Sequence, residues 1–369
     1  MILSGRDTGV GVWARGLIGA LGRCGGAHEY LVYHGRDVRE LPALTSGNGR
    51  YVAVPIGNAR RAQRILYEQL LLPSRLLRDG VDVLHCPAYV RPVRSRIPTV
   101  ITLHDLFALS HARLCKRLNV LHFRALLPPS IRGATLIHCT SEWTRGELAR
   151  LFPGQERKAH VITPAVDDLF VPCDDADADR AVLARLGLSE PPFLFVGNVE
   201  PKKNVGALLA AFAECRGRLR PARKLLIVGG TGWHNRDIFD TIRRLDLDEY
   251  VVQAGYVPRK ELPGIYRASL ALVFPSLVEG FGLPPLEAMA CGVPVICSGG
   301  SGLTESVGDA ARIVAAGDVP ALARAMEEVA DSAALRADLI GRGLNRAGRF
   351  CWPERVGQFT ELYHRAVSA

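Results

Sequence analysis

Short apolar runs alternate with longer amphipathic stretches along almost the whole chain. Each run has the length of a buried strand, and each amphipathic stretch repeats its apolar residues every three or four positions, as a helix does. Strands that alternate with helices form parallel sheets with crossover helices. In the first half of the chain, this pattern predicts strands at residues 1–3, 30–33, 51–54, 81–86, 100–103, 136–139 and 160–162.

A second series of the same kind predicts strands at residues 193–196, 224–228, 251–254, 270–274, 293–297 and 312–314. An acidic stretch that contains prolines separates the two series. We therefore expect an α/β protein whose two Rossmann-like domains, 1–170 and 193–350, face a central cleft and are joined by a linker at 171–192. The last segment, 351–369, carries its apolar residues on one helical face and is expected to return to the N-terminal domain.

The length and composition limit the kind of protein. A chain of 369 residues, 48% hydrophobic and 22% charged, has the balance of a globular protein with two domains, which excludes a disordered or fibrous chain. No apolar run approaches the roughly 20 residues of a membrane-spanning helix. The N-terminus lacks the features of a signal peptide, and the nine cysteines are scattered without a C-x-x-C pair. These features predict a cytoplasmic protein.

The segment that follows the predicted strand at 270–274 holds the most informative chemistry. A polar loop leads into a helix that opens with two prolines, and the amides of residues 280–283 form a positive field suited to an anion. Glu279 in the loop and Glu287 in the helix are suited to accept hydrogen bonds from sugar hydroxyls. In the alternative interpretation, Glu287 only caps the helix and Glu279 is a solvated loop acid.

This segment resembles the E-x7-E signature of glycosyltransferase family 4, whose members are retaining enzymes of the GT-B fold. The signature runs here from Glu279 to Glu287 and contains Gly-Phe-Gly-Leu. Further loops resemble the same family, each after a predicted strand. They are Val196-Gly-Asn-Val-Glu-Pro-Lys-Lys-Asn, Ile227-Val-Gly-Gly-Thr-Gly-Trp, Ala254-Gly-Tyr-Val-Pro, Thr102-Leu-His-Asp-Leu and, at the N-terminus, Gly9-Val-Gly.

The resemblance implies a role for each matching residue. Lys203 would neutralise the donor diphosphate, Glu279 would contact the donor sugar, and His104 would reach that sugar or the reaction centre. Glu287 would hold the ribose hydroxyls, with Tyr256 or Val257 near the base. The residues expected to bind the donor sugar and diphosphate are Gly9, Gly11, Asn198, Gly280, Phe281, Gly282 and Leu283. Plainer interpretations are a solvated lysine at 203, a core histidine at 104 and a simple turn at 9–11.

The resemblance also implies the reaction. We expect a retaining hexosyltransferase that needs no metal and no cofactor, and that uses a nucleotide-diphosphate sugar, with GDP-mannose the first candidate. Its acceptor would be a glycan or a lipid-linked acceptor in surface-polysaccharide biosynthesis. Alternatives on the same fold are a sugar-phosphate epimerase or phosphorylase, and a non-catalytic protein that binds glycans or lipids. The D-x-D patterns within 175–179 mimic a metal motif, but they fall in the predicted linker and helix start, where Asp favours capping.

The positive charge is concentrated in the first half of the chain. Residues 1–170 contain 23 Lys+Arg and 13 Asp+Glu, a net +10, whereas residues 171–369 contain 23 and 24, a net −1. The segment 58–79 combines five arginines with a cluster of leucines, which fits a helix lying on the anionic inner face of the cell membrane. Ordinary packing of these leucines against the sheet is the competing interpretation. Nucleic acid is a weaker explanation of the charge, because basic residues and aromatic residues do not interleave.

Overall fold

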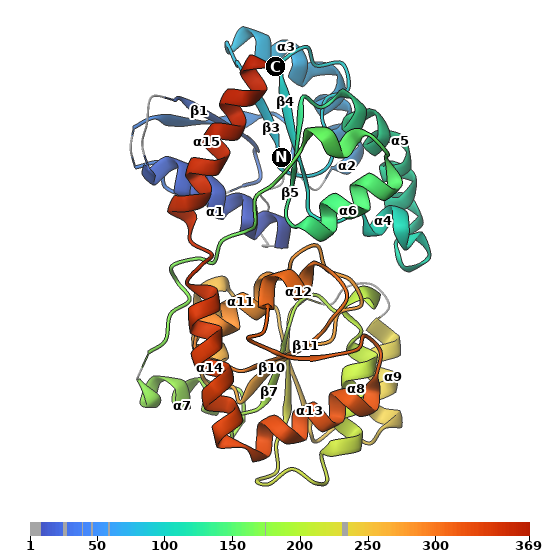
Figure 1. Cartoon of the computed structure of the whole chain (residues 1–369), viewed down its shortest axis with the longest axis vertical. Coiled ribbons are helices and arrows are strands. Elements are labelled where there is room, and N and C mark those ends of the chain that lie inside the picture. Colours follow the sequence, from blue (N-terminus) through green and yellow to red (C-terminus); the bar gives the residue numbers. More distant parts are fainter. Residues whose placement is uncertain are drawn as a thin grey trace. The chain divides into compact units, whose positions relative to one another are not determined.

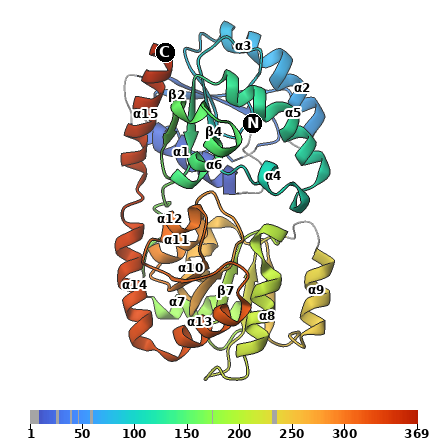
Figure 2. The same cartoon turned by 45° about the vertical axis from the view of Figure 1, so that its right-hand side comes forward.

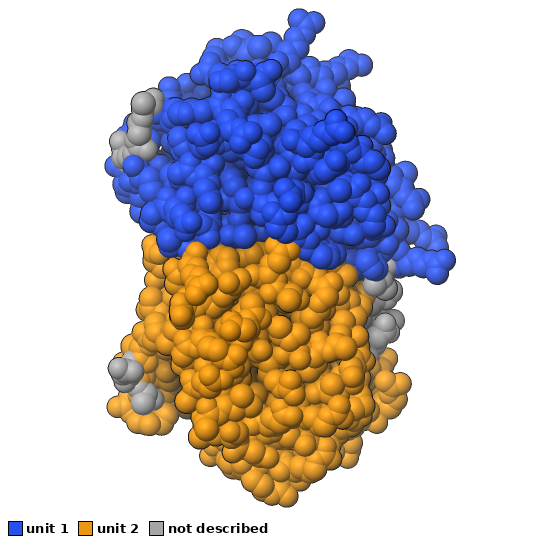
Figure 3. Space-filling view, in the orientation of Figure 1, with its two compact units in different colours: residues 1–165, 351–369 blue, residues 166–350 orange. Residues whose placement is uncertain are grey.

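The computed structural model describes residues 9–24, 28–38, 40–45, 47–57, 60–173, 175–230 and 235–369. The chain divides into two compact units: unit 1 comprises Met1–Ala165 with Cys351–Ala369, and unit 2 comprises Val166–Phe350 (Figure 3). In each unit, helices cover parallel strands (Figures 1 and 2). The strand predicted at residues 1–3 lies outside the described residues. The segment 171–192, predicted to be a linker, clusters with unit 2.

Within its described residues, unit 1 contains two parallel sheets. One sheet has the order β3 (Leu84–Cys86), β4 (Thr99–Leu103), β5 (Leu136–Cys139) and β6 (Ala159–Val161). The other pairs β1 (Tyr30–Gly35) with β2 (Gly49–Val54). Every residue of β4 and β5 is buried, which is why these strands have nearly continuous apolar sequences rather than alternating ones.

The helices of unit 1 come from both ends of the chain. They are α1 (Gly9–Cys24), α2 (Arg61–Leu66), the π-helical turn η1 (Tyr67–Leu71), α3 (Leu72–Arg78), α4 (Phe107–Ser110), η2 (Ala112–Leu114), α5 (Arg117–Gly133), α6 (Glu142–Leu151), η3 (Gln155–Lys158) and α15 (Trp352–Ser368). Gly16 of α1 lies against the indole of Trp352, so closely that a Cβ at this position would overlap the ring. The expected return of the C-terminal helix to the N-terminal domain is thereby confirmed.

A chain of hydrogen bonds, buried at His138 and partly buried at His85, joins this C-terminal helix to the sheet. The Ile162 carbonyl can only accept, so Nε2 of His138 carries a proton and donates to it (2.8 Å). Nδ1 of His138 then accepts from the Thr102 hydroxyl (3.0 Å), whose oxygen accepts from Nε2 of His85 (2.7 Å). Finally, Tyr363 donates to Nδ1 of His85 (2.8 Å). Both imidazoles are therefore neutral and fully hydrogen-bonded.

Acid is expected to destabilise unit 1 through these two histidines. Burial lowers the pKa of His85 to about 3 and holds the pKa of His138 well below its usual value. In the unfolded chain both titrate near pH ~6.5, so below that pH the unfolded state binds more protons than the folded state. The free energy of unfolding should fall by about 2 kcal/mol between pH ~6.5 and ~5, mostly through His138, because His85 is partly exposed.

Denaturant unfolding at a series of pH values measures this effect. The variant His138→Gln should show a shallower dependence on pH, and His111→Gln, which changes an exposed histidine of the same unit, should keep the wild-type dependence. A free energy of unfolding that stays constant over this pH range would contradict the lowered pKa values of these two histidines.

Unit 2 is built on one parallel sheet with the strand order β12-β11-β10-β7-β8-β9. Its strands are β7 (Phe193–Val196), β8 (Leu225–Val228), β9 (Val251–Gly255), β10 (Ala271–Phe274), β11 (Val295–Ser298) and β12 (Arg312–Val314). The four inner strands are completely buried, whereas β9 and β12 at the edges are only partly buried. The predicted α/β class with two Rossmann-like units is confirmed.

The helices of unit 2 connect these strands. They are α7 (Ala176–Arg185), η4 (Pro201–Lys203), α8 (Val205–Cys215), α9 (Asn235–Arg244), η5 (Arg259–Glu261), α10 (Leu262–Arg267), α11 (Leu283–Ala290), α12 (Gly302–Val307), α13 (Val319–Asp331) and α14 (Ala333–Ala347). The aspartates of the D-x-D patterns have structural partners here. Asp175 caps α7 through the amide of Ala178 (2.9 Å), and Asp179 pairs with Arg267 of α10 (3.2 Å).

Candidate active site

The sheet of unit 2 has one position at which the direction of strand order changes. The chain starts at β7 and builds outward through β8 and β9, then returns to β10 on the other side of β7 and continues to β11 and β12. The order therefore reverses between β7 and β10. In parallel sheets, ligands bind beyond the carboxyl ends of the strands at such a switch point, because the two loops there diverge.

Lys203 and Glu279 meet at this switch point. Lys203 ends η4, after β7, and Glu279 lies in the loop after β10. Nζ of Lys203 donates to Oε1 of Glu279 (2.7 Å) and also lies 4.7 Å from the ring centre of Phe274. The side chains are only 14% and 10% exposed. The structure thus brings together two of the predicted catalytic residues, which are 76 positions apart in the sequence.

The neighbouring lysines keep Glu279 ionised. Burial by itself raises the pKa of the Glu279 carboxyl, but the positive charges of Lys203 and Lys202 outweigh burial and hold the pKa below its usual value. The carboxylate can therefore accept hydrogen bonds, and Lys203 supplies a cation fixed in a mostly dry environment. Such a fixed cation can stabilise negative charge that develops on a leaving diphosphate.

Glycines allow the loops around this pair to approach one another. A Cβ at Gly302 would overlap the carbonyl oxygen of Gly280, and the amide of Gly302 donates to the Glu279 carbonyl (3.0 Å). On the other side of β7, a Cβ at Gly229 would overlap the Gly197 carbonyl oxygen. Side chains at these two positions would push the loops apart and displace Glu279 or the end of β7.

The helix α11 starts directly after this loop. Its N-cap is Gly282, whose φ of 99° is a left-handed conformation that glycine adopts without strain. A proline in the first turn of α11 removes an amide that would have no partner there. Gly280 and Phe281 are buried, and the Phe281 ring packs against Phe350 (5.5 Å between ring centres). If Phe281 contacts a donor, it therefore does so through its backbone, as expected.

Glu287 lies in α11 within its own hydrogen-bond network. It is 4% exposed; Oε1 accepts from Nη1 of Arg259 (2.8 Å) and Oε2 accepts from the Tyr266 hydroxyl (3.0 Å). Arg259 also lies 3.5 Å from the Asp167 carboxylate and stacks on the Phe170 ring (4.7 Å). Burial and the charge of Glu287 raise the pKa of Tyr266 well above its usual value, so its hydroxyl stays protonated and donates.

The remaining predicted donor residues lie on the same edge of the sheet. Asn198 follows β7, and its side-chain oxygen is close to Gly230 in the loop after β8. Tyr256 and Val257 follow β9; Tyr256 is 45% exposed, whereas Val257 packs partly against the core. Residues 231–234 of the second predicted loop lie outside the described part of the chain.

Three predicted residues belong to unit 1. His104 follows β4 at the carboxyl end of the sheet, and its Nε2 donates to the Pro87 carbonyl (2.9 Å). Gly9 and Gly11 are not in a loop: Gly9 is the first residue of α1 and Gly11 is buried in its first turn. The structure therefore places these glycines at a helix N-terminus, with Gly9 exposed.

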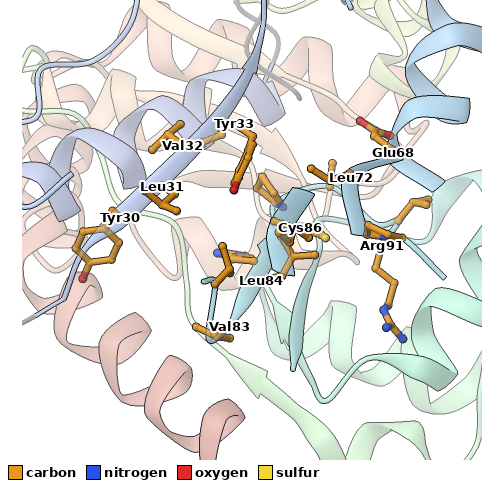
Figure 4. Close-up of a pocket in the computed structure, with 18 of the residues that line it drawn as sticks. Tyr30, Leu31, Val32, Tyr33, Glu68, Leu72, Val83, Leu84, Cys86 and Arg91 are labelled. Atoms are coloured by element: carbon orange, nitrogen blue, oxygen red, sulfur yellow. The ribbon is translucent and has the colours of Figure 1, made fainter. Parts of the chain in front are cut away.

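Unit 1 contains a large cavity, separate from the loops of unit 2 described above. It encloses about 1100 Å³ and is lined by β1, by β3, and by helices that include α3. Figure 4 shows Tyr30 to Tyr33 of β1 on one side, and β3 with Leu72 on the other. Within the described residues, β1 pairs only with β2 and β3 only with β4, so both strands turn an edge of the sheet toward the cavity. Side chains of α1, α2, α5 and α15 complete the lining of the cavity.

Known proteins resemble this chain in sequence. The profile described as "Glycosyltransferase Family 4" matches residues 8–168, and the one described as "Glycosyl transferases group 1" matches residues 184–346. The O-antigen chain mannosyltransferase B of Escherichia coli is 30% identical over 371 residues, covering 96% of each chain. The chain belongs to glycosyltransferase family 4.

Solved structures show the fold of this family 4 glycosyltransferase to be GT-B. WaaG, a glycosyltransferase involved in lipopolysaccharide biosynthesis, superposes with a TM-score of 0.77 at 15% identity and covers 98% of this chain and 97% of its own. HepE of Anabaena, in complex with UDP-glucose, superposes with a TM-score of 0.75 at 18% identity and covers 97% and 96%. The resemblance found in the loop motifs is therefore confirmed at the level of family and fold.

Sequence reasoning missed the partners of Glu287 in this family 4 enzyme. Arg259 and Tyr266 lie 28 and 21 positions before it, on η5 and α10, and no local motif links them to the E-x7-E segment. A weak signal was present, because Arg259 and Tyr266 flank a short amphipathic stretch after the predicted base-proximal loop. A buried carboxylate needs a charged or hydrogen-bonded partner, and Arg259 and Tyr266 meet this need for Glu287.

Replacing Arg259 with glutamine should raise the KM for the donor about tenfold and change kcat less, because Glu287 would lose the group that orients it. Steady-state kinetics with varied donor measure this split. Arg267→Gln is the matched control, since Arg267 lies on the adjacent α10 and makes an ion pair of similar exposure with Asp179 instead. Equal effects of both substitutions on KM would contradict a specific role for Arg259.

Proposed function

We propose that this glycosyltransferase moves a hexose from a nucleotide-diphosphate sugar to a glycan or lipid-linked acceptor in surface-polysaccharide biosynthesis, with retention of configuration and without a metal. The observation that carries the proposal is the Lys203–Glu279 pair at the switch point of unit 2. A buried cation beside an ionised carboxylate suits a substrate that combines a diphosphate with sugar hydroxyls. Mannose and GDP are our first candidates, supported by the activity named for the Escherichia coli relative.

Each group at the site has a separate role in the transfer reaction. Cleavage of the bond between the sugar and the diphosphate leaves positive charge on the sugar carbon and negative charge on the departing phosphate. Lys203 and the amides at the start of α11 stabilise the departing charge, and Glu279 holds the sugar through its hydroxyls. The departing phosphate accepts the proton of the acceptor hydroxyl as the new bond forms on the same face of the sugar. Glu279 is already engaged by Lys203, so we assign it no covalent role.

A donor panel tests this proposal most directly. The full-length protein is incubated with UDP-, GDP- and ADP-sugars together with lipid and oligosaccharide acceptors, and both nucleotide diphosphate and glycosylated product are measured. We expect both products in equal amounts with one donor, and NMR of the product should show the anomeric configuration of that donor. Nucleotide diphosphate released without transfer to any acceptor would contradict a transferase.

Metal independence needs its own measurement. Within the described residues, no group of three His, Cys, Asp or Glu side chains is arranged to hold a metal ion, so the structure suggests no ligand set to mutate. We expect full transfer activity in excess EDTA, because Lys203 supplies the positive charge that a metal would otherwise provide. Activity lost in EDTA and restored by Mg²⁺ or Mn²⁺ would contradict this part of the proposal.

A further inference from the structure

Leucines on the helical segment 61–78 of unit 1 point in two different directions. Tyr67, Leu72 and Leu76 are buried against the core of unit 1. Four other leucines on the same segment are more than half exposed: Leu66 (60%), Leu70 (52%), Leu71 (59%) and Leu77 (62%). Packing against the sheet therefore accounts for only part of the leucine cluster found in the sequence, and a second apolar row faces solvent.

The neighbouring helix α5 repeats this pattern. Leu118 and Leu121, one turn apart in its first turns, are 76% and 66% exposed. The guanidinium of Arg61 at the start of α2 donates to the side chain of Asn119, so the first turns of the two helices are in contact. Figures 1 and 2 both show α2 beside α5. We call these six leucines, on segments 61–78 and 117–133, the leucine surface.

Basic residues surround the leucine surface. Arg60, Arg61 and Arg78 are exposed on or beside the segment 61–78, and Lys116, Arg117 and Arg124 are exposed on or beside α5. Residues 107–141 contain five Lys+Arg and no Asp or Glu. Exposed leucines among basic residues, on helices that lie at the surface, are the features of a helix that binds in the interface of an anionic membrane.

Charge argues against the other occupants. A second copy of this chain would bring two basic surfaces together, which opposes association. A nucleic acid would use the basic residues but would find no partner for six exposed leucines. Within the described residues, no helix is long and apolar enough to span a bilayer, so insertion would be limited to the interface.

We propose that the leucine surface binds the interface of an anionic lipid bilayer, with its leucines at the acyl boundary and the surrounding Lys and Arg side chains at the headgroups. This inference goes beyond the transfer reaction proposed above and does not depend on it, since binding to vesicles requires neither donor nor acceptor. It explains where the positive charge of the first half of the chain acts.

Sedimentation with vesicles tests the proposal. The full-length protein is mixed with vesicles of phosphatidylcholine alone or with added phosphatidylglycerol, at ~0.1 M and ~0.5 M salt. We expect binding only with phosphatidylglycerol and weaker binding at the higher salt. Absence of binding to the anionic vesicles would overturn the proposal.

Paired variants locate the surface. We expect vesicle binding to weaken at least tenfold in the double variant Leu70→Ser with Leu118→Ser. The double variant Arg61→Gln with Arg117→Gln should also weaken binding at least tenfold, because each charge removed costs about fivefold in affinity. The matched controls, Val171→Ser with Phe239→Ser and Arg185→Gln with Arg244→Gln, change exposed residues of unit 2 and should leave binding unchanged. Circular dichroism and thermal unfolding confirm that each variant folds.

Two outcomes would assign the leucine surface differently. Controls that weaken vesicle binding as much as the paired variants would show that binding is not located on segments 61–78 and 117–133. Sedimentation equilibrium without lipid tests for a dimer. If the protein were a dimer and the double variant Leu70→Ser with Leu118→Ser were a monomer, the leucine surface would bind a second copy of the chain. Either result would overturn the proposal.

Discussion

Replacing Lys203 with alanine is expected to lower kcat for sugar transfer about 10³-fold. The side chain places its ammonium 2.7 Å from Glu279 in a site with little water, so its charge acts on the leaving diphosphate with little screening. Removing it takes away the main fixed cation that the described loops bring to this point and leaves the buried Glu279 carboxylate unpaired. Steady-state kinetics with saturating donor measure the loss.

The adjacent lysine is the control for this substitution. Lys202 lies on the same η4 turn and also lowers the pKa of Glu279, but the 2.7 Å hydrogen bond to the Glu279 carboxylate comes from Lys203. Lys202→Ala should therefore reduce kcat only a few-fold. Glu279→Gln and the double variant Lys203→Ala with Glu279→Gln complete a double-mutant cycle. The loss of kcat in the double variant should be smaller than the product of the two single losses, because the two residues act as one unit. Equal activity of Lys203→Ala and Lys202→Ala would refute the assignment.

Replacing Gly302 with alanine is expected to destabilise unit 2 by about 3 kcal/mol and to abolish donor binding. The new methyl group would overlap the Gly280 carbonyl oxygen, and the neighbouring Glu279 carbonyl accepts from the Gly302 amide. Neither atom can move without shifting the loop that carries Glu279. Denaturant unfolding measures the stability, and calorimetry with the donor measures binding.

A helical glycine serves as the control for the Gly302 substitution. Gly341 lies within α14, and an added Cβ would meet no atom within 4 Å. Gly341→Ala should leave donor binding unchanged and stabilise the protein by up to about 1 kcal/mol, because alanine favours helix more than glycine does. If Gly302→Ala bound donor like the wild type, the close approach of the two loops would not be needed for the site.

The strands and the family could be predicted because their signals are local. Buried parallel strands such as β7 and β10 are short apolar runs, and the E-x7-E segment carries its glycines and carboxylates within a few residues. The position of Lys203 beside the E-x7-E segment could be predicted as well, since Lys203 follows a strand in a recognisable loop. For these residues, topology alone brings the loops to one edge of the sheet.

Contacts between distant elements could not be predicted from such patterns. The partners of Glu287 come from η5 and α10, and one hydrogen bond of His85 comes from Tyr363, near the other end of the chain. The segment 58–79 also had two interpretations, because a pattern of leucines does not tell which of two apolar rows is buried. In each case the answer depends on how elements that are distant in the sequence pack against one another.

The way in which unit 2 joins the rest of the chain has a consequence for folding. Its first residue, Val166, donates its amide proton to the carbonyl of its last residue, Phe350 (2.9 Å). Unit 2 is therefore an inserted segment whose two ends meet. While it is unfolded, unit 1 must close a long loop to bring α15 onto α1, at an entropic cost of roughly 4 kcal/mol. Once unit 2 has folded, that loop is effectively only a few residues long. The order in which the two units fold thus sets when the C-terminal helix can dock.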